Sequence, residues 1–411
     1  MKRPIALGLS PNTEPEDVQS ALKMLFTPWN YKKGKAIEQL EHWFCNYFGT
    51  SHAISFNNGR GALYAVLSAL DIGREDEVIL QAFTCVVVPD AILALGARPV
   101  YADITRSLTI DPTEVEKKIT KKTRAILVQH TFGIPTDMES IMEIAKKYKL
   151  FVIEDAAHTI GGEYKKKKLG TIGTAGIFSF GRDKAFSSVF GGVAITRDNA
   201  LGKKIRVFQR QRGYPSGSWI MQQLFHPVAF SVILPLYDFF ALGKILLVGL
   251  QKMKLLSFPV SSAEKRGKFS PLSIKRFPNA LAVLALEQVQ KLHRYNQRRK
   301  EVAKYYLDKA EEFGLDLAYK KDIPYLRFPI FMKHPTTARE YFRKSGMYLG
   351  DWYAHVIDPR DSNFSAVGYI RGSCPRAEEA ARAIVNLPTY PLMTEEDAHA
   401  VVDVLRHYVT Q

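Results

Sequence analysis

One lysine lies between two apolar runs near the middle of the 411-residue chain. Residues 176–180 read Gly-Ile-Phe-Ser-Phe, Lys184 follows in a short polar turn, and a Gly-Gly pair at 191–192 precedes a second apolar run. An amine held in a half-dry pocket has a lowered pKa, because burial disfavours its charged form, and the neutral amine can attack a carbonyl. The alternative is a solvated lysine in an ordinary turn. The choice between the two depends on the other residues of the chain.

Two further polar groups follow apolar runs. Residues 57–61 (Asn-Asn-Gly-Arg-Gly) lead into a helical pattern, and the N–H groups at a helix N-terminus suit a phosphate, with an ordinary strand-to-helix turn as the alternative. Asp155 and His158 end another run, where an acid is unusual as core filler, although the histidine alone suits a cap or a core. A phosphate turn, a buried acid and a strand-end Ser179 with Lys184 are together the parts that pyridoxal 5′-phosphate requires.

The elements that must bring these residues together are indicated by alternating strand and helix patterns. Near-continuously apolar runs separated by helical patterns predict an α/β fold, with a mostly parallel seven-stranded sheet covered on both faces. Ligands bind at the carboxyl ends of the strands in such sheets. The predicted strands are 52–56, 77–80, 99–102, 125–129, 150–154, 176–180 and 192–196. The predicted helices of this part are 36–48, 61–70, 86–95, 112–118 and 138–147.

We expect three regions in the chain: a large cofactor-binding domain with an N-terminal helical segment (1–220), an apolar and basic insertion (221–270), and a smaller α+β C-terminal domain (271–411). In the last, helices are predicted at 278–312, 337–345, 376–384 and 394–408, and strands at 325–333 and 366–371. Trp352, Tyr353 and His355 lie in a predicted loop, for which aromatic packing is favoured over contact with a substrate.

Composition narrows the possible partners. The formal net charge of +16 would suit nucleic acid, anionic lipid or a phosphorylated substrate, but no nucleic-acid module is recognisable, so nucleic-acid binding is the weakest hypothesis. The three cysteines, Cys45, Cys85 and Cys374, lack metal-ligand spacing, which predicts no metal site and a reducing cytoplasm. No secretory leader is recognisable at the N-terminus.

The insertion has a composition of its own. Residues 221–260 are largely apolar but are interrupted by Asp238 and Lys244, and the longest uncharged run is shorter than the ~20 residues that span a bilayer. Basic residues follow from Lys252 to Arg276, against one acid, Glu264. This pattern predicts peripheral contact with an anionic membrane at its inner face, and with it a lipid-linked substrate. A dimer-interface arm and a lid over the substrate pocket are the alternatives.

From about residue 35 to the C-terminus the chain resembles the sugar aminotransferases of the DegT/DnrJ/EryC1/StrS family, which are fold-type I enzymes that use pyridoxal phosphate. The resemblance rests on the combination and order of short motifs rather than on any one of them. These motifs are Asn58-Gly-Arg-Gly-Ala-Leu63, Ala82-Phe-Thr84, Gly96-Ala-Arg-Pro-Val100, Glu154-Asp-Ala-Ala-His158, Phe178-Ser-Phe180 with Lys184, Gly191-Gly192, Cys374-Pro-Arg-Ala-Glu378 and Leu387-Pro-Thr-Tyr-Pro391.

The resemblance implies a role for each matching residue. Lys184 corresponds to the lysine that forms a Schiff base with the cofactor and carries the proton between substrate carbons. Asp155 corresponds to the acid that keeps the pyridine nitrogen protonated, and His158 to the residue that contacts the ring. The residues implied to hold the phosphate are Gly59, Arg60 and Ser179.

Four positions depart from the family pattern. Arg60 stands where a small hydroxyl residue is usual, and Cys85 stands where an aromatic residue usually stacks on the cofactor ring. Ala185 follows the lysine in place of the common Asn, and the segment near Arg276 lacks the Asn that commonly reaches the partner subunit's phosphate. The departures affect the details of the pocket and leave the lysine in place.

The implied reaction is transamination of a keto-sugar, nucleotide-linked or lipid-linked, to an amino-sugar for polysaccharide or glycoconjugate biosynthesis. Glutamate is the implied amino donor, and the implied assembly is a homodimer with shared active sites. A branch of the family replaces the lysine by histidine and performs sugar dehydration, so the retained Lys184 favours transamination. A cofactor-dependent dehydratase and a non-catalytic regulatory relative are the alternatives.

Overall fold

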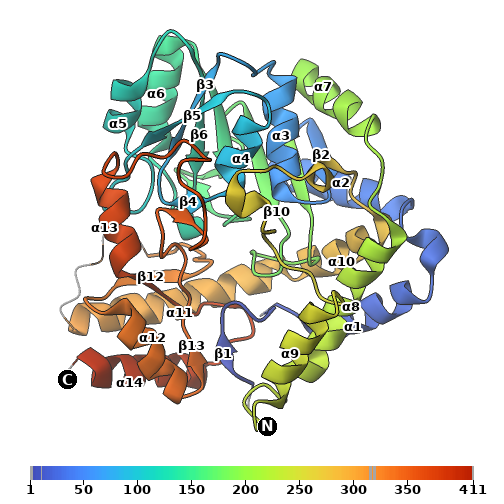
Figure 1. Cartoon of the computed structure of the whole chain (residues 1–411), viewed down its shortest axis with the longest axis vertical. Helices are drawn as coiled ribbons and strands as arrows, with labels where there is room; N and C mark the ends of the chain where they lie inside the picture. The colour runs from blue at the N-terminus through green and yellow to red at the C-terminus, as the bar shows by residue number, and fades with distance from the viewer. Residues whose placement is uncertain (1–2, 11, 314–316, 318–320, 410–411) are drawn as a thin grey trace.

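The computed structural model describes residues 3–10, 12–313, 317 and 321–409. At its centre lies a seven-stranded sheet in the order β2-β11-β10-β7-β6-β3-β5 (Figure 1). Only β11 runs antiparallel to its neighbours, and the remaining pairs are parallel. The predicted α/β sheet is therefore confirmed. Its strands are β2 (His52–Phe56), β3 (Glu77–Gln81), β5 (Arg98–Ala102), β6 (Thr123–Gln129), β7 (Phe151–Asp155), β10 (Ala175–Ser179) and β11 (Gly192–Thr196).

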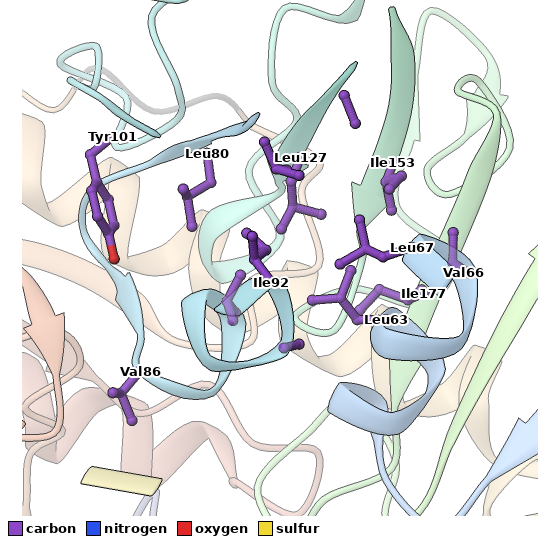
Figure 2. Close-up of a cluster of buried hydrophobic side chains, with 14 of the residues drawn as sticks. Leu63, Val66, Leu67, Leu80, Val86, Ile92, Tyr101, Leu127, Ile153 and Ile177 are labelled. Atoms are coloured by element: carbon purple, nitrogen blue, oxygen red, sulfur yellow. The ribbon is translucent and has the colours of Figure 1, made fainter. Parts of the chain in front are cut away.

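The sheet is buried on both faces, which is why its strands read as apolar runs rather than as alternating patterns. On one face, Leu63 and Leu67 of α3 (Gly59–Ala69) approach Leu127, Ile153 and Ile177 (Figure 2). The residues that alternate with these along the strands fill separate cores on the other face. Successive side chains point to opposite faces of a strand, so each strand contributes to two cores.

Helices cover both faces of the sheet. The helix α3 is capped by Asn58, whose side chain accepts a hydrogen bond from the Gly61 N–H (2.8 Å). The helix α4 (Val87–Leu93) packs beside α3. The other helices of this part are α1 (Pro15–Leu25), α2 (Lys35–Phe48), α5 (Pro112–Lys118), α6 (Met138–Tyr148) and α7 (Asn199–Arg210).

The C-terminal part lies below the sheet in Figure 1 and is crossed by the long helix α11 (Leu292–Glu312). It contains the antiparallel pair β12 (Phe328–Phe331) and β15 (Ile384–Leu387). The first strand of the chain, β1 (Ile5–Ala6), runs parallel to β13 (Met347–Tyr348) in this part. The other helices here are α10 (Asn279–Gln290), α12 (Pro335–Lys344), α13 (Pro375–Ala383) and α14 (Glu395–Val409).

The strand predicted at 366–371 is wrong. These residues form turns, and Val367 and Tyr369 pack into the core of the large sheet, where the Tyr101 hydroxyl donates to the Val367 carbonyl (2.8 Å). Their alternating pattern therefore reflects insertion of two side chains into an existing core, without a partner strand. The strand that pairs with β12 is β15 instead.

The insertion contains two helices, α8 (Gly217–Ile233) and α9 (Leu242–Lys252). Helix α8 packs against α1 and α10, and it shares a small core with α9 through Phe230, Ile233 and Leu250. Most of the remaining surface of α9 is exposed apolar side chains. Within the described residues, no helix has both the length and the hydropathy needed to cross a membrane. The division at residues 220 and 270 stays a prediction.

Candidate active site

A pocket of about 340 Å³ opens at the carboxyl ends of β7 and β10, next to the N-terminus of α3. All seven residues that sequence reasoning selected line this pocket, although they come from distant parts of the chain. They are Gly59, Arg60, Cys85, Asp155, His158, Ser179 and Lys184. The location agrees with the rule that open α/β sheets bind ligands at the ends of their strands.

Lys184 is held in a tight turn beyond β10. Its N–H donates to the Gly181 carbonyl (3.1 Å), and its own carbonyl accepts from Nδ2 of Asn12 (2.7 Å). The Nζ atom lies 4.6 Å from the centre of the Trp352 ring. Burial lowers the pKa of the Lys184 amine, while Asp183 and Asp155 oppose this effect. The turn therefore presents an amine whose neutral form is favoured by its surroundings.

Asp155 is the last residue of β7, and only 5% of it is exposed. Its Oδ1 atom accepts a hydrogen bond from the Ala157 N–H (3.0 Å). Burial raises the pKa of this carboxyl, and the Ala157 N–H and Lys184 lower it. A carboxylate has about four acceptor sites, so Asp155 has the capacity to hold a further positive donor.

His158 is buried and neutral. Its Nδ1 atom accepts from the Phe132 N–H (3.1 Å), which assigns the ring proton to Nε2, and Nε2 then donates to the Tyr353 hydroxyl oxygen (3.1 Å). Burial sets the pKa of His158 well below its ordinary value, and Lys184 adds to this effect. The ring also stacks with Trp352, at 5.4 Å between ring centres. His158 is thus fixed in one tautomer and one orientation.

The first turn of α3 closely approaches the end of β10. A Cβ atom on Gly59 would lie 2.9 Å from the Ser179 Cβ, and one on Gly192 would lie 2.5 Å from the Gly59 nitrogen. Glycine at both positions therefore lets the helix N-terminus meet the two strand ends. The opening N–H groups of a helix lack intrahelical partners and favour an anion, which suits a phosphate at this place.

Arg60 is engaged by the insertion. Its guanidinium forms an ion pair with Glu264, and it also donates to the Pro259 carbonyl (2.6 Å). Both side chains are largely buried, at 12% and 4% exposed. The resemblance implied a phosphate contact for Arg60, and the structure places its guanidinium on these two acceptors of the insertion.

We call residues 257–265 the insertion wall. Within it, Phe258, Pro259 and Val260 line the pocket together with Lys265. Arg182, in the turn before Lys184, donates to the carbonyl and hydroxyl oxygens of Ser257. Of the alternatives for the insertion, this placement favours a lid, because the segment itself lines the pocket.

Sequence reasoning missed several residues that contribute to the site. Trp352 and Tyr353 pack together, as favoured, but they also line the pocket. Asp358 lines it too. Burial, and secondly the negative charge of Asp351, raise the pKa of the Asp358 carboxyl to about 8. A Trp-Tyr pair in a predicted loop was the available signal, whereas Asp358 offered none.

Cys85 lies in the short strand β4 (Thr84–Cys85), which pairs with β14 (Ile357–Asp358). Burial raises the pKa of its thiol to about 11, so the thiol stays protonated at neutral pH. It supplies no ring at the position where the family has an aromatic residue. The aromatic ring near Lys184 belongs to Trp352 instead.

The residues fit pyridoxal phosphate. The helix N-terminus of α3 beside Ser179 offers N–H donors for a phosphate, the buried Asp155 offers a partner for a positive ring nitrogen, and the half-buried amine of Lys184 offers a partner for an aldehyde. These three features share one pocket.

Comparisons with known proteins agree with this chemistry. The model of the DegT/DnrJ/EryC1/StrS aminotransferase family matches residues 11–225 and 252–406, so the unmatched segment covers the C-terminal half of α8 and nearly all of α9. The spore coat polysaccharide biosynthesis protein SpsC of Bacillus subtilis is 28% identical over 405 residues, covering 96% of this chain and 94% of SpsC. GDP-perosamine synthase of Caulobacter vibrioides is 36% identical over 203 residues, covering 49% of this chain and 55% of that protein.

A solved structure gives the same fold. NtdA of Bacillus subtilis, solved with its bound cofactor PMP, superposes with a TM-score of 0.76 at 23% identity, covering 100% of this chain and 86% of NtdA. The expected fold class is therefore supported by a structure as well as by the sheet order.

Proposed function

Because the chain belongs to the DegT/DnrJ/EryC1/StrS aminotransferase family, we propose the roles that its own residues take in moving an amino group onto a keto-sugar. The chain is an aminotransferase that depends on pyridoxal phosphate. The observation that carries our assignment of roles is the half-buried amine of Lys184, whose pKa is lowered by its surroundings, in one pocket with the carboxylate of Asp155 and the neutral ring of His158.

Lys184 is the proton carrier. Its turn holds the amine in the pocket and burial lowers the pKa of the amine, so that Nζ in its neutral form can accept a proton from the carbon that bears nitrogen and return it to another carbon. When bound, pyridoxal phosphate supplies an electron-poor ring that takes up the electrons released at that carbon. Asp155 would hold the positive ring nitrogen, and His158, fixed in one tautomer by Phe132 and Tyr353, would contact the cofactor ring.

The first turn of α3 and Ser179 hold the phosphate. The N–H groups at the start of α3 supply donors, and Gly59 adds no side chain there. The Ser179 hydroxyl lies at the adjacent end of β10. Arg60 acts differently from its family position, because its guanidinium binds Glu264. In this proposal Arg60 anchors the insertion wall and does not contact the phosphate.

A spectrum tests the proposal. The purified protein reconstituted with pyridoxal phosphate should show the absorbance band of lysine-bound cofactor, and glutamate should convert it to the band of the aminated cofactor. Addition of a keto-sugar should then restore the first band and release an amino-sugar. No lysine-bound band would contradict the role of Lys184, and release of ammonia with a deoxygenated sugar would indicate a dehydratase.

The substrates are small molecules, and the family indicates a dimeric assembly. We propose that glutamate donates the amino group and that the acceptor is a nucleotide-linked or lipid-linked keto-sugar of a polysaccharide pathway. We also propose that the subunits of the homodimer share their active sites. Dilution tests this sharing, because activity per subunit should fall in step with the fraction of dimer, and full activity of isolated monomers would contradict it.

The exposed side of α9 supports a peripheral contact with the inner face of the cytoplasmic membrane. Phe240, Ile245 and Met253 are 82%, 66% and 62% exposed, and Lys252 and Lys254 lie beside them. Apolar side chains with a basic border bind anionic bilayers, because burial and charge attraction add. The neighbouring insertion wall lines the pocket, so a lipid-linked sugar could enter from the membrane side.

Vesicle flotation tests this contact. Wild type should float with phosphatidylglycerol vesicles but not with phosphatidylcholine vesicles, and Phe240→Ser with Ile245→Ser should reduce flotation by about tenfold or more. Ile370→Ser is the matched control, because Ile370 is 75% exposed and lies outside the insertion. Equal flotation of the α9 variant and the control would contradict the membrane contact.

A further inference from the structure

An ion pair lies directly behind the catalytic turn. Arg327 Nη2 and Asp183 Oδ2 are 2.8 Å apart, with the two side chains 4% and 19% exposed. Asp183 immediately precedes Lys184, and Arg327 immediately precedes β12 in the C-terminal part. The pair therefore joins the C-terminal part to the turn that carries the catalytic amine.

The same guanidinium also contacts the aromatic wall of the pocket. Its Cζ atom lies 3.6 Å from the centre of the Trp352 ring, and Lys184 Nζ lies 4.6 Å from the centre of that ring. Trp352 in turn stacks with His158. Arg327 thus touches both the residue before Lys184 and the ring against which Nζ lies.

We propose that Arg327 is a positioning residue that holds Asp183 and Trp352 around Lys184 and offsets the negative charge of Asp183, so that the amine stays ready in its neutral form. This inference rests on the proposed role of Lys184 as the reactive amine. It assigns to Arg327 an action through two neighbours and no contact with the cofactor.

Stability alone is a weak explanation for this pair. Burying two charges costs desolvation energy that their attraction does not reliably repay, and an apolar pair would fill the same space. The Nε atom of Arg327 is moreover buried without a hydrogen-bond partner within the described residues. A buried guanidinium with an incompletely satisfied donor is better explained by an electrostatic role at the adjacent lysine.

The charges around Lys184 favour the same explanation. Asp183 from its own turn, Asp155 from β7 and Cys85 from β4 act to raise the pKa of the amine, whereas burial and Arg327 lower it. Among the other groups of the pocket, His158 is neutral, as its contacts with Phe132 and Tyr353 indicate, and Arg182 donates to Ser257. Asp358 and Lys265 also line the pocket and are unchanged in the variants compared below. Without Arg327, two carboxylates would face one amine, which would hold its proton more tightly.

The experiment measures the amine in cofactor-free protein. Trace acylation with acetic anhydride at a series of pH values, followed by mass spectrometry, gives the rate for Lys184 relative to the exposed lysines of the same sample. Arg327→Met should move the labelling midpoint to higher pH and slow Lys184 labelling at fixed pH by about tenfold. Asp183→Asn should move the midpoint in the opposite direction.

Shifts of the labelling midpoint in opposite directions distinguish an effect of charge from structural damage, because a loosened turn would shift the midpoint of both variants in the same direction. The double variant should return towards the wild-type midpoint, and Arg327→Lys should restore part of it. Arg298→Met is the control, since Arg298 contacts Glu301 and the Met393 carbonyl away from the pocket. Unfolding curves confirm that each protein is folded.

Two failures are distinguishable. If wild-type Lys184 labels like an exposed lysine at every pH, the proposed role of Lys184 as a buried reactive amine fails. If it labels as a buried amine but Arg327→Met leaves the midpoint unchanged, or shifts it in the same direction as Asp183→Asn, the positioning role of Arg327 is overturned and the proposed function stands.

Discussion

The two sides of the pocket are built in different ways. The strand-end floor, by which we mean Asp155, Ser179 and Lys184, is fixed by β7 and β10, which pair through the hydrogen bonds of the central sheet. The insertion wall (257–265) is held by a few side chains, chiefly Arg60 on Glu264 and Arg182 on Ser257. The residues assigned to the reaction therefore lie on the side that the sheet holds, whereas the insertion wall depends on a few side-chain contacts.

Lys184→Ala should have the largest effect, because it removes the amine on which the floor depends. We expect transamination to fall by at least about 10³-fold, and the absorbance band of lysine-bound cofactor to disappear. Lys166→Ala, in the exposed turn between β8 (Glu163–Tyr164) and β9 (Lys167–Lys168), is the control and should keep full activity. Comparable activity of the two variants would contradict a role for Lys184, and with it the strand-end floor, in the reaction.

Asp155→Asn should have the next largest effect. An amide cannot offset the positive charge of a ring nitrogen as a carboxylate does, so kcat should fall by about 10²–10³-fold while the protein stays folded. Single-turnover kinetics with glutamate would measure the loss directly. Asp198→Asn, at the cap of α7, serves as the control because its carboxylate only caps that helix.

Glu264→Gln separates the wall from the floor. Loss of the charged bond to Arg60, which is worth about 1.5–3 kcal/mol for a charge-assisted contact, should loosen the insertion wall. We expect KM for the sugar to rise by about tenfold with kcat within about threefold of wild type. Glu312→Gln, on an exposed side chain, is the control. A fall in kcat as large as that of Asp155→Asn would show that wall and floor act as one unit.

The smallest effect should come from Asp358, the last residue of β14, which lines the same pocket. Its folded-state pKa of about 8 lies above the ordinary value of about 3.9, so its contribution to stability is present at low pH and is lost as the pH rises from about 4 through 8. Asp358→Asn should therefore leave the Tm at pH 4 nearly unchanged and raise the Tm at pH 9 by about 2–4 °C. An equal Tm difference at both pH values would contradict the raised pKa.

The floor could be predicted from the sequence and the wall could not. Asp155 and Lys184 each follow an apolar run of strand length, and the strand order of an α/β sheet brings such ends to one edge. The partner of Arg60 is Glu264, which is 204 residues away in the sequence. No local pattern could have linked the two side chains.

Two other differences have the same origin. The pattern of residues 366–371 suits a strand, yet Val367 and Tyr369 fill a core that belongs to a distant part of the chain. Arg327 and Asp183 are separated by 144 residues, and the residues around each of them form no pattern that predicts an ion pair. Local propensity predicts elements, whereas such pairings depend on the assembled fold.

The pairing of β1 with β13 has a consequence for synthesis of the protein. The Ile5–Ala6 segment cannot find its partner until Met347–Tyr348 has left the ribosome, and Asn12, just beyond it, supplies the contact to the Lys184 carbonyl. Residues 5–6 are thus translated long before they can dock. The catalytic turn acquires this restraint only after residue 348 has been made, so a nascent chain that ends before it would carry the lysine without its finished setting.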